Sequence, residues 1–168
     1  MGFIIELMKI QKNIFQTSIL KPPDYIVEMI TSKCGGWNYF HFNDEEIIQY
    51  FAQNPIPEFP NAIEVFHSFE KGQHKSDFFR YYFLYLNGGV YVDSDAMIEK
   101  DIECIIENYY FFTVKSLVNN NSMFNGFLGC EKNNTIIYTA LKNVYHMDKS
   151  ILKNDYFYIC KDLYNNVF

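Results

Sequence analysis

The 168 residues predict a single α/β domain, in which a mostly parallel, Rossmann-like sheet is flanked by helices. Three observations lead to this fold class. Apolar stretches of strand length alternate with stretches of helical period. Hydrophobic residues make up 49% of the chain and aromatic residues 19%, which is enough to fill a sizeable core. A short apolar strand, residues 90–92, runs directly into acidic residues, and ligands bind beyond the carboxyl ends of such strands.

Four elements are predicted before residue 60, each bounded by proline, glycine or a capping residue. In chain order they are a strand over residues 8–20, a helix over 24–34, a strand over 37–42 and a helix over 44–54. Asn43 and Glu46 have the spacing of a capping box, in which each side chain binds the other residue's backbone N–H. This spacing marks the start of the fourth element.

The best-defined helix is predicted over residues 76–86, with Ser76 as its N-cap. One face carries an apolar stripe at helical spacing: Phe79, Tyr82, Phe83 and Leu86. Asp77 and Arg80 lie on another face, three residues apart, and taken alone this spacing favours a plain ion pair within the helix. His74 precedes the helix and is predicted to lie in a solvated turn.

Two glycines join this helix to the strand over residues 90–92. Gly88 is a typical helix stop, and Gly89 allows the backbone to turn tightly into the strand, where Tyr91 is predicted to pack. The later predicted elements are strands over 109–115 and 123–130 and amphipathic helices over 135–147 and 155–168.

The charge of the chain argues against two classes of partner. Its net charge is −6 and its pI is near 5.1, and its basic residues do not form a large cluster. We therefore expect neither a nucleic acid nor an anionic membrane as a partner. The four cysteines are widely spaced without a zinc-ligand pattern, which favours reduced thiols. They are Cys34, Cys104, Cys130 and Cys160.

The first residues do not match a targeting signal. Gly2 follows Met1 as in myristoylated proteins, but Glu6 stands where that pattern requires serine or threonine. The apolar start is too short to span a membrane, and no signal-peptide cleavage site follows it. We therefore expect no signal peptide or transmembrane segment in this chain, and a location in the cytoplasm or in a host cell's cytoplasm.

Asp93 and Asp95 follow the strand over residues 90–92. Because they are two residues apart, an extended backbone points both side chains to the same side. Two carboxylates this close repel each other unless a cation lies between them. Hard carboxylate oxygens suit Mg²⁺ or Mn²⁺. The pair therefore predicts a metal site, with a plain acidic turn as the alternative.

Three kinds of site are compatible with such a pair at first sight. An EF-hand loop fails, because Cys104 would stand where a bidentate glutamate is required. A phosphoaspartyl phosphatase also carries D-x-D after a strand, but it usually has threonine or valine where Met97 stands, so it remains a weak rival. In the third kind of site, a metal ion clamps the diphosphate of a nucleotide sugar. Such an ion would let an acidic protein hold an anion.

The acidic pair is the end of a longer motif that begins at Ser76. The segment SDFFRYYFLYLNGGVYVDSD fits the pattern [SA]-D-x-x-R-x-x-x-L-x-x-x-G-G-x-Y-x-D-x-D. It resembles the glycosyltransferases with a DXD sugar-binding region, which include yeast-type α-1,6-mannosyltransferases, α-1,4-galactosyltransferases, capsular polysaccharide enzymes and the glucosylating clostridial toxins. The stretch IQKNIFQTS is similar to the family's opening I-P-K-x-I-H-Q-x-W, although Phe15 replaces the histidine and no tryptophan follows Thr17.

The resemblance implies a GT-A-like fold and a role for each matching residue. Asp77 and Arg80 would be catalytic, and Asp93 and Asp95 would bind Mn²⁺ or Mg²⁺. The donor-binding residues would be Phe15, Gln16, Thr17, Ser76, Asp77, Arg80, Asp93 and, on a looser match, Asn125.

The implied function is a metal-dependent transfer of a hexose from a UDP- or GDP-sugar to an unknown glycan or protein acceptor, with retention of configuration. Residues 1–168 would form one GT-A-type domain that binds the nucleotide sugar. Family members typically run longer, so the acceptor part would be incomplete and the domain C-terminally truncated. A non-catalytic nucleotide-sugar-binding domain is the first alternative, and a phosphatase of the phosphoaspartyl type is the weaker one.

Overall fold

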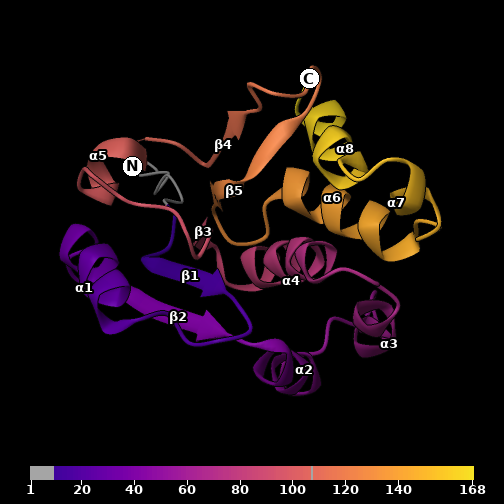
Figure 1. Ribbon diagram of the computed structural model, residues 1–168, viewed down its shortest axis with the longest axis horizontal. Coiled ribbons are helices and arrows are strands. Elements are labelled where there is room, and N and C mark those ends of the chain that lie inside the picture. Colours follow the sequence, from indigo (N-terminus) through magenta and orange to yellow (C-terminus); the bar gives the residue numbers. More distant parts are fainter. Residues whose placement is uncertain (1–9, 107) are drawn as a thin grey trace, which may run out of the picture.

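The computed structural model describes residues 10–106 and 108–168, and within them a five-stranded sheet carries helices on both faces (Figure 1). In chain order the elements are β1 (Asn13–Thr17), α1 (Asp24–Lys33), β2 (Asn38–Phe42), α2 (Asp44–Gln53), α3 (Ala62–His67), α4 (Gly72–Asn87), β3 (Gly89–Val92), α5 (Ile102–Ile106), β4 (Phe111–Lys115), β5 (Met123–Cys130), α6 (Thr135–His146), α7 (Ile151–Asn154) and α8 (Tyr158–Val167).

The sheet is mixed, with the strand order β2-β1-β3-β5-β4. β1 pairs in parallel with β2 and β3, as predicted, whereas β5 pairs antiparallel with both β3 and β4. The parallel part is therefore narrower than the predicted mostly parallel sheet. The reason is the short connection between β4 and β5, residues 116–122, because a parallel pair needs a crossover of a dozen residues or more.

Two hydrophobic cores lie on opposite faces of the sheet. Alternation along the strands sends Phe15 and Tyr91 into the larger core, and Ile14 and Val90 into the smaller one. Helices α4, α6 and α8 cover the larger core, while α1 and α5 cover the smaller (Figure 1). The layered α/β architecture expected from the sequence is confirmed.

Helix α4 begins at Gly72, four residues before the predicted start. Ser76 is therefore an interior residue and not the N-cap. His74, predicted to lie in a solvated turn, is buried, and its ring contacts Tyr156 with centroids 4.9 Å apart. This tertiary contact extends the helix beyond its local sequence signal. Because α4 is packed on several sides, Asp77 and Arg80 are buried together with the apolar stripe.

β1 spans Asn13–Thr17 and is shorter than the predicted strand over residues 8–20, of which residues 8 and 9 lie outside the described part of the chain. The other boundaries agree with the predictions to within a few residues, and the capping box of α2 is present. Three short helices, α3, α5 and α7, were not predicted, since four to six residues are too few to show a helical period. Gly2 and Glu6, on which the myristoylation argument depends, lie outside the described residues. Among those described, no helix combines the length and apolar character needed to cross a membrane.

Gly89 lies where α4 turns into β3 and adopts φ of +114°, in the region that favours glycine. A Cβ at this position would lie 2.4 Å from the carbonyl oxygen of Asn13. We expect Gly89→Ala to destabilise the protein by about 2 kcal/mol or more, because it adds both backbone strain and a clash with β1. Urea unfolding measures this loss. Gly35→Ala is the control, since a Cβ there meets nothing within 4 Å. Equal stability of Gly89→Ala and wild type would contradict the tight approach of β3 to β1.

Candidate functional site

The carboxyl ends of β1 and β3 lie side by side, and polar side chains gather there. Phe15 pairs with Tyr91, so Gln16 lies near the residue that ends β3. The amide Nε2 of Gln16 donates to the carbonyl oxygen of Asp93 at 3.0 Å, and the hydroxyl of Tyr39 donates to Gln16 Oε1 at 2.9 Å. These two bonds fix the backbone on which Asp93 stands.

Arg80 is the centre of the site and is only 4% exposed. Its Nη1 lies 3.0 Å from Asp77 Oδ1 and donates to the carbonyl oxygen of Asn125 at 2.5 Å. Its Nη2 donates to Ser76 Oγ at 3.2 Å and lies 3.6 Å from Asp93 Oδ1. One guanidinium group thus joins α4, β5 and the end of β3.

Tyr91 supports this guanidinium from one side, with its ring centroid 3.7 Å from the Arg80 carbon Cζ. Burial alone would lower the pKa of Arg80, but Tyr91, Asp77 and Asp93 together raise it above its ordinary value. Arg80 therefore stays charged. Tyr91 was predicted only to pack, yet its hydroxyl also lies 3.2 Å from both Thr17 Oγ1 and Ser76 Oγ, which are 2.6 Å apart.

Asp77 is buried beside Arg80. Burial raises the pKa of its carboxyl group, while the charge of Arg80 and the amide of Asn125 oppose this rise. Asn125 Nδ2 lies 3.4 Å from Asp77 Oδ1 and 2.9 Å from the hydroxyl of Tyr81, to which it donates. The ion pair predicted from the i,i+3 spacing is present, but it is part of a buried polar network and not a solvated helix face.

Asn125 reaches this network because β5 is irregular. The register with β4 jumps from Thr113↔Leu128 to Val114↔Phe124, so residues 125–127 have no counterpart in β4. Such bulges turn a side chain away from the regular alternation. Gly126 lets the backbone of β5 lie close to the side chain of Asp93, because a Cβ at this position would lie 2.2 Å from Asp93 Oδ2.

The structure therefore brings together most of the residues predicted to bind a donor: Gln16, Thr17, Ser76, Asp77, Arg80, Asp93 and Asn125. Phe15 lies apart from them. Its ring is fully buried between Phe83 and Tyr91, with centroid separations of 4.3 Å and 5.1 Å. Its visible contribution is to pack the strand that carries Gln16 and Thr17.

Two buried polar atoms of the network have no hydrogen-bond partner among the described residues. They are Nε of Arg80 and Oδ1 of Asn125. Because buried polar groups in native proteins are nearly always paired, each such atom calls for an explanation. A polar ligand at this site would supply the missing partners.

The acidic pair has the chemistry of a divalent-cation site. The Asp93 side chain is 32% exposed and Asp95 is exposed, so solvent and ligands reach both carboxylates. Within residues 10–106 and 108–168, no three His, Cys, Asp or Glu side chains form a ready-made metal cage. Two carboxylates fit Mg²⁺ or Mn²⁺ nevertheless, because these sites commonly take their other ligands from water and from substrate phosphates.

Three residues near the network were not predicted from the sequence: Tyr81, Tyr156 and Cys160. Helix α8, which carries Cys160, packs against β5, and burial together with the charge of Asp77 raises the pKa of both Tyr156 and Cys160. The segment from Tyr156 to Cys160 includes the start of α8, about 80 residues after Asp77 in the chain. No local pattern connects positions so distant in sequence.

Cys160 provides a test of this packing. Burial, followed by the charge of Asp77, raises the pKa of its thiol to about 12, whereas Cys104 is exposed. The thiolate is the reactive form, so iodoacetamide at pH 8 should alkylate Cys104 and leave Cys160 almost unmodified. Peptide mass spectrometry measures both. Equal labelling of the two thiols would contradict the placement of α8 against β5.

Comparisons with known proteins show the family to which this chain belongs. Residues 23–112, more than half of the chain, match the family described as "Glycosyltransferase sugar-binding region containing DXD motif". An uncharacterised glycosyltransferase of Acanthamoeba polyphaga mimivirus is 29% identical over 105 residues, which cover 62% of this chain and 41% of that protein. Inositol phosphoceramide mannosyltransferase 1 of Schizosaccharomyces pombe (strain 972 / ATCC 24843) is 32% identical over 76 residues, 45% of this chain and 23% of that protein.

Among solved structures, the PaToxG glycosyltransferase superposes with a TM-score of 0.62 at 19% identity, covering 94% of this chain and 69% of that one. This likeness shows a shared GT-A-like fold. The chain spans less than half the length of both curated relatives. The matched residues contain Asp77, Arg80, Asp93 and Asp95, the core of the site described above. The chain belongs to the family of glycosyltransferases that carry a DXD sugar-binding region.

Proposed function

We propose that this protein is a metal-dependent glycosyltransferase, in which residues 1–168 form one domain that binds a nucleotide sugar. It would transfer a hexose from a UDP- or GDP-sugar to a glycan or protein acceptor, with retention. The observation that carries this proposal is the buried Arg80, held between Asp77 and Asp93 at the end of β3 inside the matched family region.

Asp93 and Asp95 would hold Mn²⁺ or Mg²⁺. When bound, the ion would neutralise the diphosphate of the donor as its charge develops. Asp93 is the better positioned of the two, because Gln16 fixes its backbone and Arg80 lies beside its carboxylate. Asp95 is exposed and has freedom to turn toward the same ligand.

Arg80 would bind the donor electrostatically and steady the leaving diphosphate. Its charge is permanent, its position is fixed from three elements, and its Nε lacks a partner among the described residues. Asp77 would hold this guanidinium in place and, with Asn125, face the sugar. Thr17, Ser76 and Gln16 would border the nucleotide, with Phe15 supporting their strand from within the core.

Retention is proposed from the resemblance alone, and the surroundings of Asp77 favour one route to it. Asp77 is buried and already bound by Arg80 and Asn125, so it is poorly placed to attack a sugar carbon. A front-face reaction fits better, in which the acceptor hydroxyl attacks on the side from which the diphosphate leaves. The diphosphate, held by Arg80, would take the acceptor proton.

Donor hydrolysis tests this function without a known acceptor, because glycosyltransferases slowly transfer their sugar to water. The purified protein is incubated with Mn²⁺ and UDP-glucose, UDP-galactose, UDP-N-acetylglucosamine or GDP-mannose, and free sugar and nucleoside diphosphate are quantified by chromatography. GDP-mannose is included because one relative is named a mannosyltransferase. Equal amounts of sugar and diphosphate are expected from one donor class.

The alternatives give different products. Donor binding without hydrolysis would support a non-catalytic nucleotide-sugar-binding domain. Phosphate release from p-nitrophenyl phosphate, with no sugar released from any donor, would support the phosphatase. Either result would overturn the proposed transfer reaction.

A further inference from the structure

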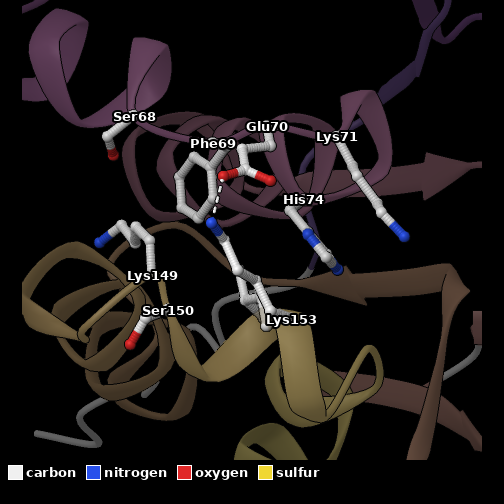
Figure 2. Close-up of a pocket in the computed structure, with 9 residues that line it drawn as sticks. Ser68, Phe69, Glu70, Lys71, His74, Lys149, Ser150 and Lys153 are labelled. Atoms are coloured by element: carbon white, nitrogen blue, oxygen red, sulfur yellow. Dashed lines mark ion pairs between the residues drawn. The ribbon is translucent and has the colours of Figure 1, made fainter.

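A cavity of about 170 Å³ opens where the start of α4 meets α7, outside the network around Arg80 (Figure 2). Its charged and titratable lining residues are Glu70, Lys71, His74, Lys149 and Lys153. Three lysines thus meet a single glutamate in a chain whose net charge is −6. A local excess of positive charge on an acidic protein indicates an anionic ligand.

Lys149 contributes positive charge to the cavity but no free hydrogen-bond donor. Its Nζ donates to the backbone carbonyl oxygens of Val144, Tyr145 and Met147 at 2.8–3.1 Å, so it closes the end of α6. Burial lowers the pKa of its amine to about 8, which still leaves it mostly protonated at pH 7. Figure 2 shows this amine turned away from the centre of the cavity.

Lys71 and Lys153 are the two cations that a ligand could recruit. Lys153 pairs with Glu70 at 2.9 Å, but both side chains are well exposed, at 64% and 70%. Such surface pairs contribute at most about 1 kcal/mol, so an incoming anion can replace Glu70 as the partner of Lys153. Lys71 is exposed, with its Nζ 4.8 Å from the ring centroid of Tyr156. It also precedes α4, a 16-residue helix that has no side-chain cap.

His74 connects this cavity to the catalytic network. Its Nε2 lies 3.1 Å from the carbonyl oxygen of Tyr156, which can only accept, so Nε2 carries a proton. His74 precedes Asp77 by one helical turn and Arg80 by two, a distance along the helix of about 9 Å. One or two sugar rings are about as long as this separation, and because His74, Asp77 and Arg80 are buried, a ligand of that length would pass over the residues that cover them.

We propose that the cavity between α4 and α7 binds a phosphate group of the acceptor, so that the acceptor is a phosphate-bearing sugar or polyol. Lys71 and Lys153 contact the phosphate, and a free hydroxyl of the same molecule reaches the donor beside Arg80. This inference rests on the transferase function proposed above and adds the chemical class of its acceptor.

The first experiment tests the pocket and is independent of glycosyl transfer. Inorganic phosphate is titrated into the wild type at constant ionic strength, and the amide signals of Gly72 and His74 are followed by NMR. Saturable shifts are expected. The double variant Lys71→Gln/Lys153→Gln should weaken binding by about tenfold or more, since each lysine loses a charge-assisted hydrogen bond. Glu70→Gln should tighten it by about threefold, because Lys153 loses its competing partner.

Lys12→Gln is the matched control. Lys12 forms a comparable surface pair with Glu103 at 2.6 Å, with side chains 59% and 57% exposed, and the substitution removes one positive charge away from the cavity, where the double variant removes two. Its phosphate affinity should equal that of the wild type. Shifts that do not saturate, or an equal loss of binding in Lys12→Gln, would overturn the proposal that this cavity binds phosphate.

The second experiment distinguishes an acceptor phosphate from free phosphate. Mannose 6-phosphate and inositol 1-phosphate are compared with mannose and inositol as acceptors, with the donor identified by hydrolysis, and products are measured by mass spectrometry. The phosphorylated probes should be preferred about tenfold in kcat/KM, and the double lysine variant should remove this preference by raising KM with little change in kcat. Saturable phosphate binding without any such preference would mean a free-phosphate site and would overturn the acceptor assignment. Donor hydrolysis by the wild type is measured alongside, so a failed transferase function is recognised separately.

Discussion

Replacing Arg80 with methionine should destabilise the protein by about 3–5 kcal/mol at pH 7, the usual loss when one partner of a buried ion pair is removed. Asp77 would keep its buried carboxylate without the guanidinium 3.0 Å away, and the carbonyl of Asn125 would lose its donor. Urea unfolding of both proteins measures the difference. Loss of donor hydrolysis should accompany it.

The pH dependence of this loss has a definite sign. Burial already raises the pKa of Asp77, and removing Arg80 removes the main force that opposes the rise. The folded variant would then hold the proton more tightly than the unfolded chain, so its stability should fall as pH rises through the folded pKa of Asp77. The stability deficit of Arg80→Met should therefore be smaller at pH 5 than at pH 8.

The double variant Asp77→Asn/Arg80→Met is the matched control. Without a carboxylate to leave unpaired, it should recover part of the stability lost in Arg80→Met and lose the added pH dependence. If Arg80→Met were as stable as the wild type at pH 8, the buried pair would not be present in solution.

Asp95→Ala should abolish metal-dependent donor binding and reduce donor hydrolysis by at least about 100-fold, while leaving stability within about 0.5 kcal/mol of the wild type. The stability is preserved because Asp95 is exposed in the turn after β3. The activity is lost because one of two candidate metal ligands is removed. Isothermal titration calorimetry measures the affinity for the nucleotide sugar that the wild type hydrolyses, with and without Mn²⁺.

Glu99→Ala is the control for this change. Glu99 is also exposed, lies four residues farther along the chain and carries the same charge. It should bind donor like the wild type. A similar loss of donor binding in both variants would mean that removing any nearby negative charge has this effect. Full turnover by Asp95→Ala would show that the metal role is wrong.

The grouping of the polar residues was easiest to predict where one continuous stretch of sequence supplies them. Asp77, Arg80 and Asp93 follow one continuous motif, and strand and helix spacing place them on adjoining elements. The predicted helix also marked Asp77 and Arg80 as distinct from the apolar stripe. Their burial was not predicted, because α4 is covered by α6 and the start of α8, which lie far along the chain.

The sheet was predicted less well at one edge. Two strand-like runs with a short polar connection between them are typical of a hairpin, a signal that favours an antiparallel β4–β5 pair and that the prediction of a mostly parallel sheet did not use. The irregular register that turns Asn125 toward Arg80 has no comparable sequence signal. Likewise, the hydroxyl contacts of Tyr91 follow from the meeting of β1, β3 and α4, not from the residues next to it.

The central claim is that the acidic pair and Arg80 form a metal-dependent site for a nucleotide sugar. Thermal unfolding of the wild type with each of four donors, with and without Mn²⁺, tests it most directly. At about 100 times its dissociation constant a ligand stabilises a protein by about 2.7 kcal/mol, which is readily measured for a domain of this size. We expect stabilisation by one nucleotide class, only when Mn²⁺ or Mg²⁺ is present. Stabilisation by none of the donors, or equal stabilisation without a metal ion, would contradict this claim.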